Sequence, residues 1–231
     1  KYISIDISEN LAAMQQRRVH EHGHGDAFHS HLGDACHQET WKKSVGNREC
    51  FIIGMEVLDN LPHDKVVAMD KGGGEMIWME TCVGEEELFR PVSDDLIKRV
   101  LDIYLRMRES HPSQSSVGSP VVDAVFNWLL DVQGVPEPIF LPTSACLLFD
   151  TIHATVPKHE MILSDFDHLP DVLVPGENAP LVSSTKDGKT RDWGTLFAPF
   201  GSADIFFPTN FELLKKMYQS EKKVTHDNVQ Y

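Results

Sequence analysis

Two acidic side chains at the end of an apolar run are the residues best placed to do chemistry in this sequence. Glu56 and Asp59 stand one helical turn apart, after the apolar residues 51–53, in the segment I-G-M-E-V-L-D-N-L-P that ends at Pro62. Open α/β sheets bind their ligands beyond the carboxyl ends of their strands. Paired carboxylates at such an edge can hold a cationic ligand, or they can cap the turn that follows a buried strand.

Other acidic residues also follow strand-like segments. Asp6 ends the run Y-I-S-I-D. A carboxylate there offers two oxygens to the vicinal hydroxyls of a ribose, although an Asp can equally lead the turn before a helix cap at Ser8. Asp165 and Asp167 lie in L-S-D-F-D-H-L-P-D, where they either line the acceptor side of a cleft or fix the loop by Asx-type bonds.

Strand-like and helix-like segments alternate around these acids, as expected for an α/β protein. The predicted elements are a strand at 2–6, a helix capped by Ser8 that runs to about Val19, a buried strand at 50–54, a hairpin at 65–83, a helix capped by Ser93, a helix at 121–132, a helix from 143 or 144 to 152, and a strand at 159–166.

Three segments are harder to interpret. Residues 20–37 break the pattern with Gly, Asp and His, and the polar residues 167–192 are predicted to be a surface excursion because they carry turn signals. A strand pair at 196–207 follows. The last helix is predicted from Asn210, with Thr209 and Glu212 as its capping box.

The composition bounds the possible partners. The 231 residues carry a net charge of −14, which argues against a direct grip on nucleic acid, because phosphate contacts need clustered Lys and Arg. A basic protein segment is a better partner. No apolar run approaches the roughly 20 residues of a membrane span. The four Cys residues, which lack a C-x-x-C pair, suggest neither a disulfide framework nor a thiolate zinc site.

A histidine-rich run offers imidazoles at high density. It contains His20, His22, His24, His29, His31 and His37 together with Cys36. Such a run can bind zinc, but alternating H-x-H in a Gly-containing loop lacks the ordered ligand spacing of known sites. A solvated loop is the default interpretation, and we predict no metal site.

Four segments in this order resemble the MidA-like family of S-adenosylmethionine-dependent methyltransferases. They are Y-I-S-I-D, I-G-M-E-V-L-D-N-L-P, L-S-D-F-D-H-L-P-D and D-I-F-F-P-T-N-F-E-L-L. The mitochondrial members of this family include the arginine methyltransferase that assists assembly of respiratory complex I. The resemblance therefore implies a protein methyltransferase, with Arg as acceptor, that acts in the mitochondrial matrix in assembly of a complex and meets a basic segment of its partner.

The resemblance also implies a fold. We expect an α/β protein with a Rossmann-like class I methyltransferase sheet, in a single domain over 1–231. Residues 65–83 would be an accessory hairpin, 84–142 a helical insertion and 143–231 the C-terminal part of the sheet. The family's first strand and glycine-rich loop are expected before Tyr2, outside the sequence given.

Roles for individual residues follow from the same resemblance. Asp6, the pair Asp34 and Ala35, and Glu56 would bind S-adenosylmethionine. Glu56 and Asp59 would be catalytic. Asn60, Asp165 and Asp167 would bind the substrate. Met55 stands where the family usually has Asn, and this replacement favours the alternative of a catalytically inactive scaffold that assists assembly of complex I or of the mitochondrial ribosome.

Overall fold

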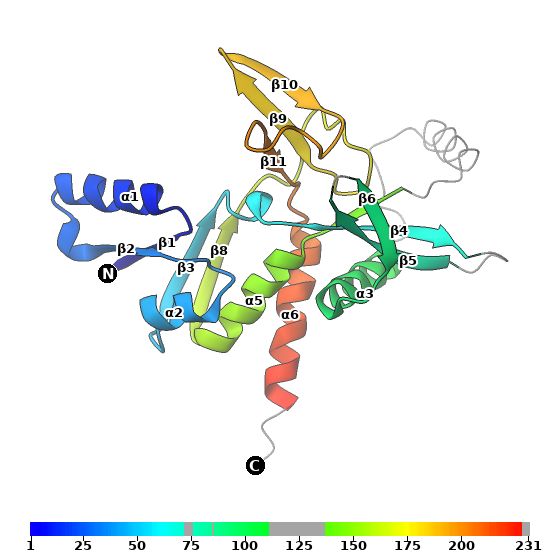
Figure 1. Cartoon of the computed structure of the whole chain (residues 1–231). Coiled ribbons are helices and arrows are strands. Elements are labelled where there is room, and N and C mark those ends of the chain that lie inside the picture. Colours follow the sequence, from blue (N-terminus) through cyan, green and yellow to red (C-terminus); the bar gives the residue numbers. More distant parts are fainter. Residues whose placement is uncertain (72–75, 85, 111–136, 228–231) are drawn as a thin grey trace. The chain divides into compact units, whose positions relative to one another are not determined.

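The computed structural model describes residues 1–71, 76–84, 86–110 and 137–227 (Figure 1). These residues form two compact units. The first unit comprises Lys1–Met55, Ser144–Ser164 and Met217–Tyr231, and the second comprises Glu56–Thr143 and Asp165–Lys216. None of the helices in the described part is long and apolar enough to cross a bilayer.

The first unit begins with a strand, a helix and a parallel strand. β1 (Tyr2–Asp6) pairs in parallel with β2 (Phe28–Leu32), and α1 (Glu9–Glu21) forms the crossover that a parallel pair requires. The Ser8 side chain accepts the N–H of Leu11 and caps α1, as predicted. A short 3₁₀ helix, η1 (Gly25–Ala27), precedes β2.

The prediction that residues 20–37 only break the pattern was wrong, because they contain β2. Its sequence, F-H-S-H-L, carries two histidines and a serine where a strand would usually have β-branched residues. Pairing with β1 imposes the strand conformation, from Tyr2 opposite Phe28 to Asp6 opposite Leu32. Tertiary pairing therefore overrides a weak local preference.

A second parallel pair completes the strands of the first unit. β3 (Cys50–Met55) lies beside β8 (His159–Ser164), with Cys50 opposite His159 and Met55 opposite Ser164. The predicted strands are confirmed, but the predicted burial of residues 50–54 is wrong in part. Phe51 and Ile53 are 69% and 62% exposed, because no element among the described residues covers that face.

Helices account for the rest of the first unit. They are α2 (Gln38–Ser44), nearly all of α5 (Thr143–Thr155) and the C-terminal part of α6 (Phe211–Asp227). α5 buries Ala145, Cys146, Phe149 and Ile152. This 3–4 spacing is that of an apolar helix face, which explains why this helix was predictable from sequence.

The second unit contains a four-stranded antiparallel sheet in the order β6-β5-β4-β7. Its strands are β4 (Asp64–Asp70), β5 (Met76–Val83), β6 (Glu87–Pro91) and β7 (Ile139–Leu141). β4 and β5 occupy the segment predicted as a hairpin, whose glycine-rich turn lies outside the described residues. Within 84–142 the structure describes α3 (Asp95–Ser110) besides β6 and β7, and the helix predicted at 121–132 also lies outside the described residues.

A second antiparallel sheet corrects the prediction for the C-terminal third. β9 (Leu181–Lys186), β10 (Lys189–Trp193) and β11 (Asp204–Phe206) pair in the order β10-β9-β11. The predicted surface excursion thus includes a hairpin, and the predicted strand pair at 196–207 contains only β11, which pairs with β9. Asp187 and Gly188 both have positive φ (53° and 72°), as a tight two-residue hairpin turn requires.

The α/β class is therefore confirmed. The described strands form four small sheets, two of them parallel pairs. A continuous Rossmann-like sheet is not seen among these strands, so that finer prediction stays a prediction. The core of the second unit includes Phe140, Val174, Val182 and Phe207.

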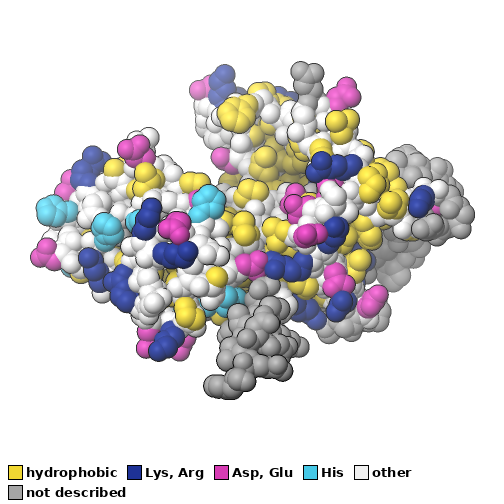
Figure 2. All heavy atoms as spheres, turned by 60° about the horizontal axis from the view of Figure 1, so that its bottom comes forward, with side chains coloured by type: hydrophobic (Ala, Val, Ile, Leu, Met, Phe, Trp, Pro, Cys, Tyr) yellow, Lys and Arg dark blue, Asp and Glu magenta, His cyan; other side chains and the backbone are white. Residues whose placement is uncertain are grey.

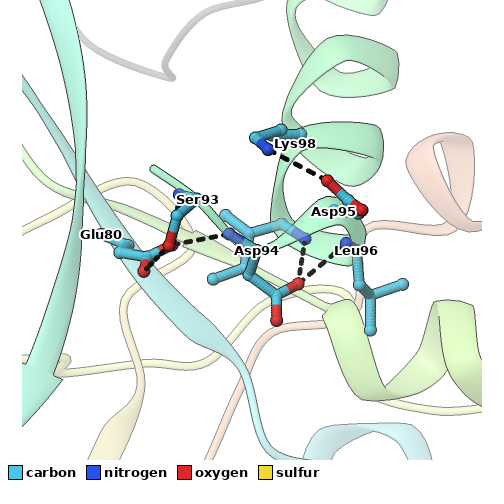
Figure 3. A network of polar contacts seen from close by, with 7 residues as sticks. Glu80, Ser93, Asp94, Asp95, Leu96 and Lys98 are labelled. Atoms are coloured by element: carbon cyan, nitrogen blue, oxygen red, sulfur yellow. Dashed lines mark hydrogen bonds and ion pairs between the residues drawn. The ribbon is translucent and has the colours of Figure 1, made fainter. Parts of the chain in front are cut away.

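The start of α3 is fixed by a buried carboxylate, shown in Figure 3. Glu80 on β5 is 2% exposed. Its two oxygens accept the N–H groups of Ser93 and Asp94 and the Ser93 hydroxyl. They also accept the Arg90 Nε–H. The helix cap itself is Asp94, whose Oδ1 accepts the N–H groups of Leu96 and Ile97 at 2.8 and 3.1 Å, and not the predicted Ser93.

Glu80 should make the stability of the protein acid-sensitive. Burial alone would raise its pKa, but the bonds from Ser93, Arg90 and Asp94 lower it from 4.5 to about 2. The stabilisation is therefore present above pH 4.5 and is lost as the pH falls toward 2. We expect Glu80→Gln to lower the free energy of unfolding by about 2–3 kcal/mol at pH 7, measured by urea denaturation.

The control for this prediction is Glu160→Gln, which changes an exposed Glu on β8. This control should stay within about 0.5 kcal/mol of the unmodified protein. The effect of Glu80→Gln should shrink between pH 4.5 and pH 3. A difference that is the same at pH 7 and pH 3 would contradict the assignment.

Candidate functional site

The segment after β3, residues 56–60, is called the acidic loop below. It begins at Glu56, which has φ 52°, a left-handed conformation that costs a non-glycine residue energy and is frequent at functional sites. A single 3₁₀ turn, η2 (Leu58–Asn60), follows. The Glu56 side chain is exposed, so its carboxylate is available to a ligand.

Asp165, which follows β8, holds the acidic loop in place. Its Oδ2 accepts the backbone N–H groups of Val57, Leu58 and Asp59 at 3.1, 2.8 and 3.3 Å, and its Oδ1 accepts the N–H of Phe166 at 2.9 Å. A carboxylate bound to successive N–H groups at the start of a helical turn satisfies donors that otherwise lack partners. The sequence left two roles open for Asp165, and these contacts show that it fixes the loop. Its role in substrate binding stays a prediction.

Asp59 is the buried carboxylate of the acidic loop. It is 3% exposed, and its Oδ1 accepts the side-chain N–H of Asn60 at 2.6 Å. Burial raises the pKa of Asp59, the charges of Asp165 and Glu56 raise it further, and the Asn60 amide opposes them. Asp59 is therefore an oriented group whose charged form is disfavoured by its surroundings.

The segment 207–210 crosses both acidic segments. The N–H of Phe207 donates to the Asp59 carbonyl at 2.8 Å, and the N–H of Thr209 donates to the Phe166 carbonyl at 2.7 Å. The ring of His63 stacks on Phe207 with centroids 3.9 Å apart. Burial lowers the pKa of His63 to about 4, although its bond to the Leu61 carbonyl opposes the shift, so this ring is neutral at pH 7.

Asp6 lies at the carboxyl end of β1 in the first unit. Its Oδ1 accepts the N–H of Ser8 at 2.8 Å and its Oδ2 accepts the Gln15 amide at 2.9 Å. Each carboxylate oxygen has two lone-pair sites, so both oxygens keep capacity for a further donor. The group is oriented and can accept two vicinal hydroxyls, even though it also leads the turn before the cap.

Asp34 and Ala35 follow the neighbouring strand end. The N–H of Gly33 donates to the Asp6 carbonyl at 2.9 Å, which brings the two strand ends together. Asp34 Oδ1 accepts the N–H of Cys36 at 2.8 Å, and the Ala35 carbonyl accepts the Trp41 indole N–H at 2.7 Å. These contacts fix a turn at the carboxyl end of β2, the kind of sheet edge where α/β folds commonly bind ligands.

The structure thus groups the predicted site residues by unit. Glu56, Asp59, Asn60 and Asp165 lie together in the second unit, and Asp6, Asp34 and Ala35 lie together in the first. Asp167 is exposed two residues after Asp165.

The histidine-rich run has surface side chains. His29 and His31 lie two residues apart on β2, with ring centroids 6.5 Å apart. Figure 2 shows histidine side chains at the surface, among interspersed acidic and basic ones. Within the described ranges, no three His, Cys, Asp or Glu side chains are grouped so as to hold a metal ion.

The comparison with family models decides the class of protein. Residues 1–229 match the model of a family described as "Putative S-adenosyl-L-methionine-dependent methyltransferase". The chain belongs to this family. S-adenosylmethionine is accordingly the cofactor of this methyltransferase family, and Asp6, an acceptor-only carboxylate with spare lone pairs at a strand end, fits its ribose hydroxyls.

A solved structure supports the fold of this chain. The chain resembles an uncharacterized protein from Burkholderia thailandensis with a TM-score of 0.55 and 12% sequence identity. The match covers 96% of this chain and 50% of that one, so the chain spans about half the length of that structure. Among proteins with curated functions, none is similar enough to count as a match.

Two parts of the candidate site were not predicted from the sequence. His63 and the segment 207–210 received no role there, although the latter lies in D-I-F-F-P-T-N-F-E-L-L, one of the four segments that carried the resemblance. That resemblance was the signal that could have identified it. The structure adds the reason, because Phe207 and Thr209 bond to the two acidic segments.

Asp165 should be the most stabilising of these acids. We expect Asp165→Ala to lower the free energy of unfolding by about 2–3 kcal/mol, because four backbone N–H groups lose their acceptor. Urea denaturation measures this change. The matched control is Asp167→Ala in the same loop, which should change stability by less than about 0.5 kcal/mol. Equal effects of the two substitutions would contradict the assigned role of Asp165.

Proposed function

We propose that this chain is the methyl-transferring part of an S-adenosylmethionine-dependent protein methyltransferase whose acceptor is an arginine side chain. The observation that carries the proposal is the acidic loop. It presents the exposed Glu56 and the buried, oriented Asp59 in a conformation that Asp165 holds in place. This arrangement suits a planar cation better than a neutral acceptor.

The two carboxylates would act by position and charge. A guanidinium presents several N–H donors in a fixed fork, which matches carboxylate oxygens. Holding the acceptor nitrogen in line with the reacting methyl group removes orientational freedom that would otherwise raise the barrier. Ionised Glu56 and Asp59 would stabilise the positive charge on the acceptor, and its binding would in turn favour ionised Asp59.

Asp6, Asp34 and Ala35 would hold the cofactor. Bound S-adenosylmethionine supplies an activated methyl group on a sulfonium. Asp6 would accept the ribose hydroxyls, and the turn at Asp34 and Ala35 would meet the adenine. Glu56 would also contribute to cofactor binding, as the family resemblance implies. The resemblance to the MidA-like family, whose mitochondrial members include an arginine methyltransferase, supports a site of action in the mitochondrial matrix, in assembly of a complex.

Cofactor titration tests the proposal. Isothermal calorimetry with S-adenosylmethionine should give saturable binding to the full-length protein, and no binding at millimolar cofactor would overturn the proposal. Asp6→Ala should weaken this binding by about 1.5–3 kcal/mol, because a charged acceptor is removed. Asp26→Ala, which changes an exposed Asp of η1, is the control and should leave the affinity unchanged.

A second candidate is a non-catalytic assembly factor. Met55, where the family usually has Asn, favours it, because its exposed thioether offers neither the donor nor the strong acceptor of an amide. Such a scaffold would use its acidic surface to hold a basic segment of a complex I subunit or of the mitochondrial ribosome. Met55→Asn distinguishes the candidates. Gain of methyl transfer or of cofactor affinity in this variant alone would support the scaffold for the unmodified protein.

A further inference from the structure

The Thr209 hydroxyl is a buried polar group without a partner. Thr209 is 5% exposed, and its Oγ1 makes no hydrogen bond with any residue that the structure describes. Buried hydroxyls usually find partners, because an unsatisfied one costs free energy. An unused hydroxyl in the core of a unit therefore calls for a functional explanation.

Helix capping does not supply that explanation. The predicted capping box of Thr209 and Glu212 is wrong, because α6 begins at Phe211 and its cap is Asn210. The Asn210 Oδ1 accepts the N–H of Leu213 at 3.0 Å. Thr209 stands one residue too early for this role, and its backbone N–H bonds instead to the Phe166 carbonyl.

The backbone places this hydroxyl beside the acidic segments. Residue 207 precedes Pro208, which holds it in an extended conformation, and in an extended segment residues two apart point to the same side. Phe207 points toward His63, on which its ring stacks. The backbone N–H groups of Phe207 and Thr209 bond to the Asp59 and Phe166 carbonyls, so Thr209 lies directly beside both acidic segments.

We propose that Thr209 is a specificity-determining residue, whose hydroxyl accepts an N–H of the guanidinium of the acceptor arginine. This inference rests on the proposed function and adds a third acceptor to the two carboxylates. In the structure the hydroxyl is shielded from solvent. The segment around Thr209 must therefore shift when the acceptor arginine binds, so that the guanidinium can reach the hydroxyl. A guanidinium has enough donors to serve two carboxylates and the hydroxyl in one plane, whereas an ammonium is a compact point charge.

The experiment compares Thr209→Val, which keeps the shape and removes the hydroxyl, with Thr209→Ser, which keeps the hydroxyl. In the full-length protein we expect Thr209→Val to raise KM for an arginine-containing peptide about tenfold, which is the loss of one hydrogen bond to a charged group. The affinity for S-adenosylmethionine should not change. Thr209→Ser should keep KM within about twofold of the unmodified protein.

Stability supplies a readout that separates this role from a structural one. Thr209→Val should unfold at the same urea concentration as the unmodified protein or at a higher one, because it removes an unpaired buried hydroxyl. A lower midpoint would show that the hydroxyl has a structural partner and would overturn the inference. An unchanged KM would also overturn it.

Failure of the proposed function can be told apart from failure of this inference. If the unmodified protein transfers no methyl group, calorimetric titration with the arginine peptide alone replaces KM, and a peptide with lysine in place of arginine is the control. Weaker binding of the arginine peptide by Thr209→Val, with lysine-peptide binding unchanged, supports the inference. Equal binding of the arginine peptide by Thr209→Val and by the unmodified protein overturns this inference alone. No binding by either protein overturns the proposed arginine acceptor, and this inference with it.

Discussion

Glu56→Gln is expected to lower methyl transfer by about 10²–10³-fold while the affinity for S-adenosylmethionine changes little. The substitution keeps the size of the side chain and removes its charge, which the acceptor needs when it is positioned for reaction. Because the effect arises only with the acceptor present, kcat/KM for the acceptor should fall far more than cofactor binding. Transfer of a labelled methyl group to an arginine peptide, beside calorimetry with the cofactor, measures both quantities.

Glu49→Gln is the matched control for this experiment. Glu49 precedes β3 at its amino end, and Glu56 follows it at its carboxyl end. Only the carboxyl end of a strand is expected to face a ligand, so Glu49→Gln should transfer methyl groups at the unmodified rate. If both substitutions leave transfer unchanged, the acidic loop has no catalytic role and the scaffold is the better proposal.

Asp59→Asn is expected to make the protein more stable and less active. The wild-type carboxylate is buried near Asp165 and Glu56, so its pKa is raised and its charged form is disfavoured in the folded state. Asparagine keeps the acceptor for Asn60 and removes the charge. We expect a gain in the free energy of unfolding within the about 0.5–2 kcal/mol typical of single stabilising changes, together with loss of most methyl transfer.

The sign of the pH dependence tests this assignment. A raised pKa means that the wild-type protein loses stability as the pH rises above 3.8, the unperturbed pKa of Asp. The advantage of Asp59→Asn should therefore be absent at pH 3 and present at pH 7, measured by urea denaturation. Asp204→Asn, on exposed β11, should show no advantage at either pH. Destabilisation by Asp59→Asn at pH 7 would mean that the charge is satisfied in the folded protein.

Elements with strong local signals could be predicted from the sequence. The Ser8 cap and the apolar face of α5 are properties of a few neighbouring residues, which explains why α1 and α5 were predicted with nearly correct bounds. The strands β3 and β8 were recognised by apolar runs of strand length. Their partial exposure was not predicted, because burial depends on what covers a sheet and not on the strand itself.

Elements whose conformation depends on distant partners were missed. β2 contains histidines that favour a strand only weakly, and it forms by pairing with β1. β9 and β10 are polar, and pairing across the turn at Asp187 and Gly188 makes them strands. A local ambiguity explains the two wrong caps: Ser93 and Thr209 each precede an Asp or Asn that can also cap, and the cap lies one residue later than predicted.

The candidate site was predictable in its residues but not in how those residues are used. Glu56, Asp59 and Asp165 were all singled out from strand ends. Only the structure shows that Asp165 accepts N–H groups from residues more than a hundred positions earlier in the chain. No sequence spacing encodes such a contact, because it depends on β3 and β8 lying side by side.

The left-handed backbone at Glu56 has a consequence for how this chain can be engineered. A residue with φ 52° is one that glycine would occupy with less strain. A screen that selects only for thermal stability would therefore favour Gly at position 56, and Asn at position 59 for the reason given above. Both changes remove a carboxylate from the acidic loop. Thermostabilised variants of this protein should thus be selected with an activity assay in parallel, or these two positions should be held fixed.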